Sequence, residues 1–174
     1  MTPSPSASSS PSALDLALRP WPLVAATALG LSAGAMLTEA ALLVGIWRAM
    51  PPAAFLRWFA DHEPALVAFY GPLQTATTAA VVLAAVACLR TRRGGAGLWL
   101  AATVLTLAVL GLFFAYFAAA NASFAAGTIA VDDVPAELRR WSAWQWARTA
   151  CGVGAFIAGI AALRRTATTG QLAT

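Results

Sequence analysis

The sequence predicts an all-α integral membrane protein, a four-helix bundle over residues 21–165. Of its 174 residues, 60% are hydrophobic and only 10% are charged, whereas soluble domains carry about 25% charged residues. The hydrophobic residues gather into four long runs that are separated by arginines, prolines and glycines. Each run is long enough to cross a bilayer as a helix, and this decides the fold class.

The expected boundaries follow from these runs. Residues 1–20 are rich in Ser, Pro and Ala, and we expect them to be disordered because they hold too little apolar surface to offset the entropy lost on ordering. Residues 166–174 form a C-terminal tail. The four spans are expected at residues 23–47, 65–89, 98–120 and 142–163.

The first span contains a carboxylate. Glu39 lies about two turns before the end of this span, at a depth where an ionised side chain is costly and usually marks a functional site. Gly30 and Gly34 form a Gly-x-x-x-Gly spacing, which lets a second helix approach closely. Such small-residue faces would allow a homo-oligomer.

The segment before the second span predicts a short amphipathic helix that lies on the membrane surface, with Phe55 and Phe59 on its apolar face. His62 is the only histidine, and a single histidine supplies too few ligands for a metal ion, so we expect a solvated turn here and no metal site.

The second span carries two polar side chains on one helix face. Tyr70 and Gln74 are four residues apart and therefore share this face.

The third span ends in aromatic residues, including Phe113 and Phe114, and Asn121 stands at its end. A long loop over residues 122–140 is expected next, with Asp133 as the N-cap of a short helix that leads into Trp141 and Pro135 in its first turn. The fourth span opens with polar and aromatic residues at positions i, i+3, i+4 and i+7, which share one helix face: Trp141, Trp144, Gln145 and Arg148. Most of the seven tryptophans are expected as anchors at the membrane–water interfaces, with Trp144 as the exception because it shares the Arg148 face.

Arginine positions predict the orientation. Four spans place both termini on one side, and the basic residues expected on that side outnumber those opposite: Arg19, Arg90, Arg92, Arg93, Arg164 and Arg165 against Arg48, Arg57, Arg139 and Arg140. We therefore expect a cell-membrane protein with cytoplasmic termini. The arginines form no basic stripe, which argues against nucleic acid as a partner.

All four spans offer polar side chains to the layer far from the termini: Glu39, Tyr70, Gln74, Asn121, Gln145 and Arg148. We expect Glu39 and Arg148 to lie close together, because a carboxylate–guanidinium pair offsets part of the burial cost of each group. Three interpretations stay open. The pair fixes helix packing, it belongs to a ligand pocket rimmed by Tyr70, Trp144 and the phenylalanines, or Arg148 extends to the membrane surface.

The C-terminal half resembles the anthrone oxygenase-like family of small membrane proteins, also described as a domain of unknown function. The resemblance rests on Asn121, the acidic loop after it, and an Arg-Trp-x-x-Trp-x-x-x-Arg-Thr segment formed by Arg140, Trp141, Trp144, Arg148 and Thr149. Where the family often has Asn and His after the second Trp, this chain has Gln145 and Trp146.

The resemblance implies oxidation of an anthrone to an anthraquinone without a metal or flavin cofactor. Such chemistry needs a base and a means of stabilising an anion. Glu39 would be the base, and Arg148, with Gln145 and Asn121, would hold the oxyanion, while Tyr70, Gln74 and Trp144 would contact the substrate. The expected partners are membrane lipid and a lipophilic small molecule. The alternatives are a non-catalytic lipid or small-molecule binder, a subunit of a membrane complex, or, less in keeping with the lack of inverted repeats, an oligomeric transporter.

Overall fold

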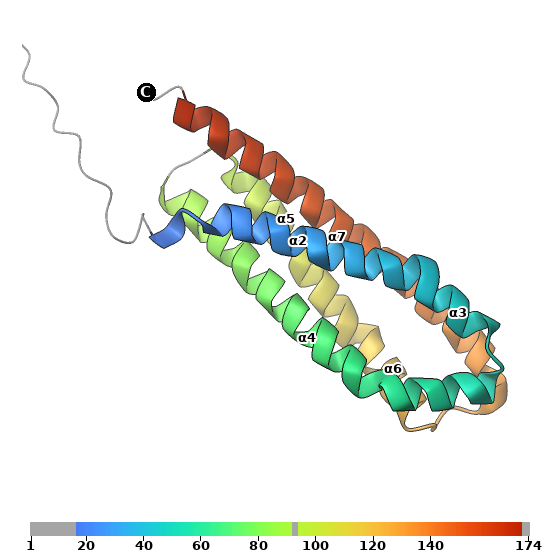
Figure 1. Ribbon diagram of the computed structural model, residues 1–174. Coiled ribbons are helices and arrows are strands. Elements are labelled where there is room, and N and C mark those ends of the chain that lie inside the picture. Colours follow the sequence, from blue (N-terminus) through green and yellow to red (C-terminus); the bar gives the residue numbers. More distant parts are fainter. Residues whose placement is uncertain (1–16, 92–93, 172–174) are drawn as a thin grey trace, which may run out of the picture.

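The computed structural model describes residues 17–91 and 94–171. The segment expected to be disordered, residues 1–20, lies outside the described residues except for positions 17–20. The described chain is helical in four long stretches (Figure 1). Its elements in order are α2 (Trp21–Thr38), the π-helical η1 (Glu39–Leu43), α3 (Val44–Ala49), α4 (Pro52–Arg90), α5 (Ala96–Leu112), the π-helical η2 (Phe113–Phe117), α6 (Ala118–Ala125), the 3-10 turn η3 (Val131–Asp133) and α7 (Val134–Gln171).

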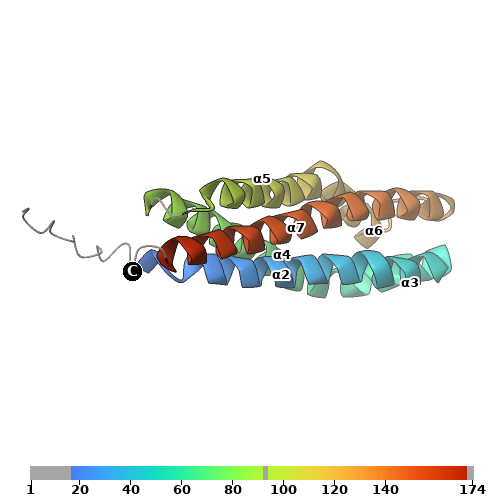
Figure 2. The ribbon, with the colours of Figure 1, turned by 90° about the horizontal axis from the view of Figure 1, so that it is seen from above.

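The protein is a multi-pass membrane bundle, as predicted. Its four helical stretches are each long and apolar enough to cross a membrane: Trp21–Ala49, Pro52–Arg90, Ala96–Ala125 and Val131–Arg165. In the bundle, α2 and α5 each pack against both α4 and α7, so the four helices follow the order α2, α4, α5, α7 around the bundle. The start of α2 and the end of α7 lie at one end, here called the proximal end, and the α3–α4 turn lies at the distal end (Figure 2).

The predicted surface helix before the second span is wrong. It is the first part of α4, which continues without a break from Pro52 to Arg90. Phe55 and Phe59 are 0% and 2% exposed, because their helix face packs against aromatic side chains of other helices and not against lipid. At about 1.5 Å per residue, α4 is about 58 Å long and extends well past an apolar layer of about 30 Å.

The predicted loop over residues 122–140 is too long, but the helix start predicted after Asp133 is confirmed. The third stretch continues to Ala125, and α7 begins at Val134 and runs without a break through the expected short helix into the fourth span. Pro135 fits the first turn of α7, where its missing N–H costs no helical hydrogen bond. At the other end α7 continues to Gln171, into the expected C-terminal tail.

Two clusters of buried side chains form the core. The proximal core contains mostly small residues around Trp99, and the distal aromatic cluster contains Trp47, Phe55, Phe59, Phe117, Phe124 and Trp141 with neighbouring aliphatic residues. Trp47, Trp99 and Trp141 are 1%, 0% and 2% exposed, so their expected role as interfacial anchors is wrong. Each buries a large apolar ring among other helices, which excludes it from the lipid surface.

The glycines after α4 form a tight turn before α5. Gly95 has a φ of 95°, a region that side-chain-bearing residues rarely adopt. A Cβ at Gly95 would also lie 2.8 Å from the backbone oxygen of Ala162 in α7. The turn therefore requires glycine for both its backbone conformation and its close contact with α7.

Candidate functional site

Two π-helical segments mark the same region of the bundle. Glu39 is the first residue of η1, and η2 contains Phe113, Phe114 and Phe117. A π-helical turn changes the phase of the side chains that follow it, and such turns occur frequently at functional sites. Glu39 is 6% exposed and Phe117 is 0% exposed, so both are directed into the bundle.

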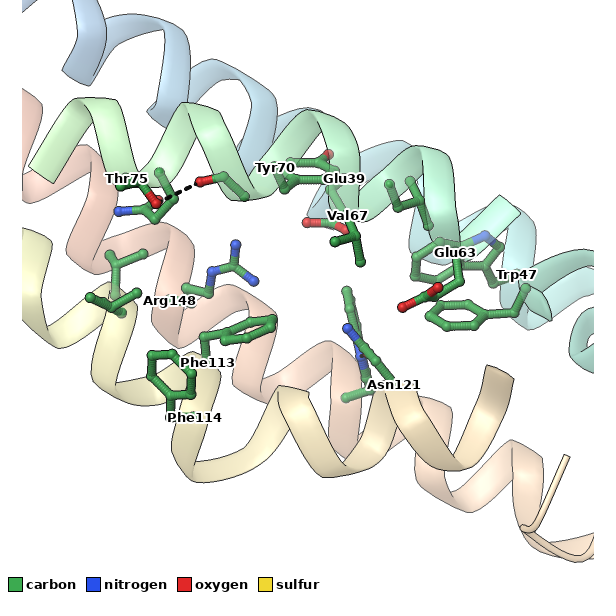
Figure 3. A pocket seen from close by; sticks show the side chains of 17 residues that line it. Glu39, Trp47, Glu63, Val67, Tyr70, Thr75, Phe113, Phe114, Asn121 and Arg148 are labelled. Atoms are coloured by element: carbon green, nitrogen blue, oxygen red, sulfur yellow. Dashed lines mark hydrogen bonds between the residues drawn. The ribbon is translucent and has the colours of Figure 1, made fainter. Parts of the chain in front are cut away.

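A cavity of about 210 Å³ lies next to the distal aromatic cluster. One water molecule needs about 10–15 Å³ by the same kind of measure, so this space can hold an organic molecule. The wall is mostly apolar and aromatic, with a few polar groups (Figure 3). Five of the sequence-predicted site residues line it: Glu39, Tyr70, Gln74, Asn121 and Arg148.

Glu39 and Arg148 form no salt bridge within 4.0 Å, but their charges are close enough to attract each other, in keeping with the expected proximity. The Nε2 atom of Gln145 donates to Glu39 Oε2 at 2.8 Å and lies 3.3 Å from the backbone oxygen of Met36. Gln145 is completely buried and does not line the cavity. It acts from behind Glu39, and a neutral amide thereby holds the carboxylate in place.

Arg148 remains within the bundle and does not extend to the membrane surface. Its side chain lines the cavity and is 7% exposed, with Cζ 5.1 Å from the centroid of the Phe117 ring. Besides this cation–π contact, its charge is attracted by Glu39 at a distance beyond a salt bridge. Among the described residues Arg148 has no hydrogen-bond acceptor, and its Nε is buried without one. A buried charge without hydrogen bonds is costly, so this guanidinium is suited to an anionic or carbonyl ligand.

Asn121 is oriented by Trp141. The Trp141 Nε1–H donates to Asn121 Oδ1 at 2.9 Å. Because this bond occupies the amide oxygen, the amide NH₂ is left to donate into the cavity that both residues line. Asn121 lies within α6 and not at the end of the helix as predicted, since the helix continues to Ala125.

Trp144 does not line the cavity. Its ring is 37% exposed and stacks on Tyr116 with centroids 5.2 Å apart and planes 10° apart. The predicted common face of α7 is therefore divided: Trp141, Gln145 and Arg148 point inward, and Trp144 packs against η2. Trp144 is at position i+3, which lies to one side of the line formed by positions i, i+4 and i+7 on the helix surface. Its side chain is therefore turned toward the neighbouring helix.

The sequence interpretation missed several cavity residues, including Glu63, Trp47 and Trp141. Glu63 belongs to the segment that was expected on the membrane surface. It lies seven residues before Tyr70, so the two residues share a face if α4 is one helix. This spacing could have predicted that Glu63 lines the cavity. No sequence pattern of this kind predicts that Trp47 and Trp141 are buried, because tryptophan is also common at membrane interfaces.

His62 does not line the cavity, although its neighbour Glu63 does. Its Nδ1 lies 2.8 Å from the backbone oxygen of Trp58, and its ring stacks on the Trp58 ring at 4.2 Å. Across the described ranges, no cluster of three His, Cys, Asp or Glu side chains is placed to hold a metal ion.

Comparisons with protein-family models, curated proteins and solved structures give no match to this chain.

Proposed function

We propose that the cavity binds a lipophilic aromatic molecule of the anthrone type and oxidises it with dioxygen, without a metal or flavin. The observation that carries this proposal is the arrangement of Glu39 and Arg148: both line one cavity, and no salt bridge within 4.0 Å joins them. A carboxylate that is paired with arginine is a weak base. A carboxylate held by the Gln145 amide keeps more of its basicity.

In the proposed reaction, Glu39 takes a proton from the methylene carbon of the anthrone. Arg148 and the Asn121 NH₂ stabilise the negative charge that moves onto the carbonyl oxygen. The carbanion donates its electron pair to dioxygen and forms a C–O bond, and the peroxide takes the proton back from Glu39. Loss of the second methylene hydrogen with cleavage of the O–O bond releases water. One anthrone and one dioxygen thus give one anthraquinone and one water.

The family resemblance supports this proposal, because Asn121, Trp141 and Arg148 belong both to the resembling segment and to the cavity wall. The arginines at the proximal end, among them Arg90, Arg164 and Arg165, favour a cell-membrane protein with cytoplasmic termini. The cavity then lies in the outer half of the bundle.

The test is oxygen uptake by the purified protein in detergent with anthrone as substrate. We expect protein-dependent uptake that is lost in Glu39→Gln and in Arg148→Gln. Arg140→Gln is the matched control, because Arg140 is 67% exposed and pairs with Glu137 outside the cavity. Anthrone binding without uptake, from folded protein, would replace the oxygenase with a non-catalytic binding protein. Uptake that survives both cavity substitutions would overturn the assignment of these two residues.

A further inference from the structure

Two rows of side chains border one side of the cavity. On α4 the row consists of residues four apart, Glu63, Val67, Gly71 and Thr75, and on α5 and η2 it consists of Leu110 and Phe114. Val67 is 56% exposed and Phe114 is 69% exposed. Residues that line the cavity are therefore also part of the outer surface of the bundle, so the wall is open between these two rows.

The other walls are closed by protein. Glu39 and Arg148 come from the opposite pair of stretches, α2–η1 and α7, and lie behind the opening when it is viewed between α4 and the α5–η2 stretch (Figure 3). The distal end is covered by the aromatic cluster, in which Trp47 and Phe59 are 1% and 2% exposed. The opening between the rows is here called the α4–η2 slot.

The slot lies at the depth of the lipid chains. Gly71 is 19 residues from Arg90, or about 28 Å along α4, and Phe114 is 18 residues from Ala96, or about 27 Å along its helix. Because the hydrocarbon layer is about 30 Å thick, both edges fall inside its distal part when Arg90 is at the proximal interface. Glu63 is about 40 Å from Arg90 and reaches the headgroup level.

We propose that the ligand enters the cavity sideways, from the distal leaflet of the membrane through the α4–η2 slot. The site would then select molecules that are dissolved in the lipid, and it would present their polar atoms to Arg148 and Glu39 only after they have passed between the helices. This inference rests on the proposed ligand-binding role of the cavity and does not depend on the oxidation step.

The test is time-resolved photolabelling of the full-length protein in phosphatidylcholine vesicles, with the flash given at increasing times after a lipophilic phenyl diazirine is added. Mass spectrometry would quantify label at Glu39 and Trp141, which are 6% and 2% exposed and line the cavity, and at Val104, which is 66% exposed on the outer surface of the bundle. We expect label at all three in the unaltered protein. A sulfonated, water-soluble diazirine should label Glu39 and Trp141 much less.

Gly71→Leu should narrow the slot without disturbing the fold, because a Cβ at Gly71 meets no atom within 4 Å. We expect the rate at which Glu39 and Trp141 become labelled to fall about tenfold, which corresponds to an added entry barrier of about 1.4 kcal/mol. Label at Val104 should not change. Gly45→Leu is the matched control, because Gly45 is an exposed helical glycine with the same open space and lies outside the cavity wall.

Phe114→Ala provides a second, opposite test, since it widens the slot and should increase the internal label. Internal label that is unchanged by both Gly71→Leu and Phe114→Ala would overturn lateral entry, as would equal labelling by the sulfonated probe. Label confined to Val104 in the unaltered protein would overturn it too. Failure of the oxygenase proposal is distinguishable, since it would appear as absent oxygen uptake with internal labelling retained.

Discussion

Gln145 donates a hydrogen bond of 2.8 Å to Glu39, and the two residues are 106 positions apart in the chain. Gln145 is fully buried and Glu39 is 6% exposed, so the bond joins α7 to η1 inside the bundle. The carboxylate thus has a neutral amide as its hydrogen-bond donor, while Glu39 and Arg148 both face one cavity. The predictions below follow from this arrangement and from the contacts around it.

Gln145→Leu should destabilise the protein. The substitution removes the amide donor and leaves the Glu39 carboxylate buried without a hydrogen bond from this side, at a cost of about 1–3 kcal/mol. The measurement is thermal unfolding in detergent. The double variant Gln145→Leu with Glu39→Leu should recover part of the loss, because no unsatisfied carboxylate remains. Strictly additive losses would contradict a direct coupling.

Arg148→Met should have opposite effects on stability and function. The change removes a buried charge that has no hydrogen-bond acceptor among the described residues, and we expect this gain to offset the lost attraction to Glu39, so the melting temperature in detergent should stay the same or rise. Anthrone-dependent oxygen uptake should be lost, because the oxyanion loses its main stabilising group. A clear fall in melting temperature would show that Arg148 contributes mainly to packing.

Trp141→Phe should lower turnover more than it lowers stability. It keeps an aromatic ring in the distal cluster but removes the N–H that orients the Asn121 amide, at a cost of about 0.5–1.5 kcal/mol. Oxygen uptake and unfolding would be measured side by side. Trp99→Phe is the matched control, because Trp99 is equally buried and its Nε1 has no partner in the described part of the chain. Equal loss of turnover in both variants would argue against a role for the Trp141–Asn121 bond.

Gly95→Ala should destabilise the proximal end. Alanine would have to adopt a φ of 95° and place its Cβ 2.8 Å from the Ala162 oxygen, and strain of the backbone alone costs about 1–3 kcal/mol. Gly97→Ala, in the first turn of α5, should be neutral or stabilising, because its Cβ meets no atom within 4 Å. Thermal unfolding in detergent distinguishes the two, and similar melting temperatures would contradict the tight-turn assignment.

The fold class was predictable because it depends on quantities that the sequence contains directly. Four apolar runs of bilayer length decide that the chain crosses a membrane, and polar residues such as Glu39, Tyr70 and Arg148 are expensive enough in hydrocarbon to stand out. Their distance from the span ends also places them in one layer. The boundaries in the distal half were less predictable, since Phe55 and Phe59 suit a lipid surface and a protein core equally well.

The sequence by itself determined the membrane class, the number of spans and the layer in which polar side chains meet. Only the tertiary structure decided that Gln145 and not Arg148 bonds to Glu39, that Trp141 faces the cavity while Trp144 does not, and that the wall is open between α4 and η2. The physical reason is helix phase. Span length follows from composition, but the direction of each side chain depends on how every helix is rotated against its neighbours, and the π-helical segments η1 and η2 change that rotation without a recognisable sequence signal.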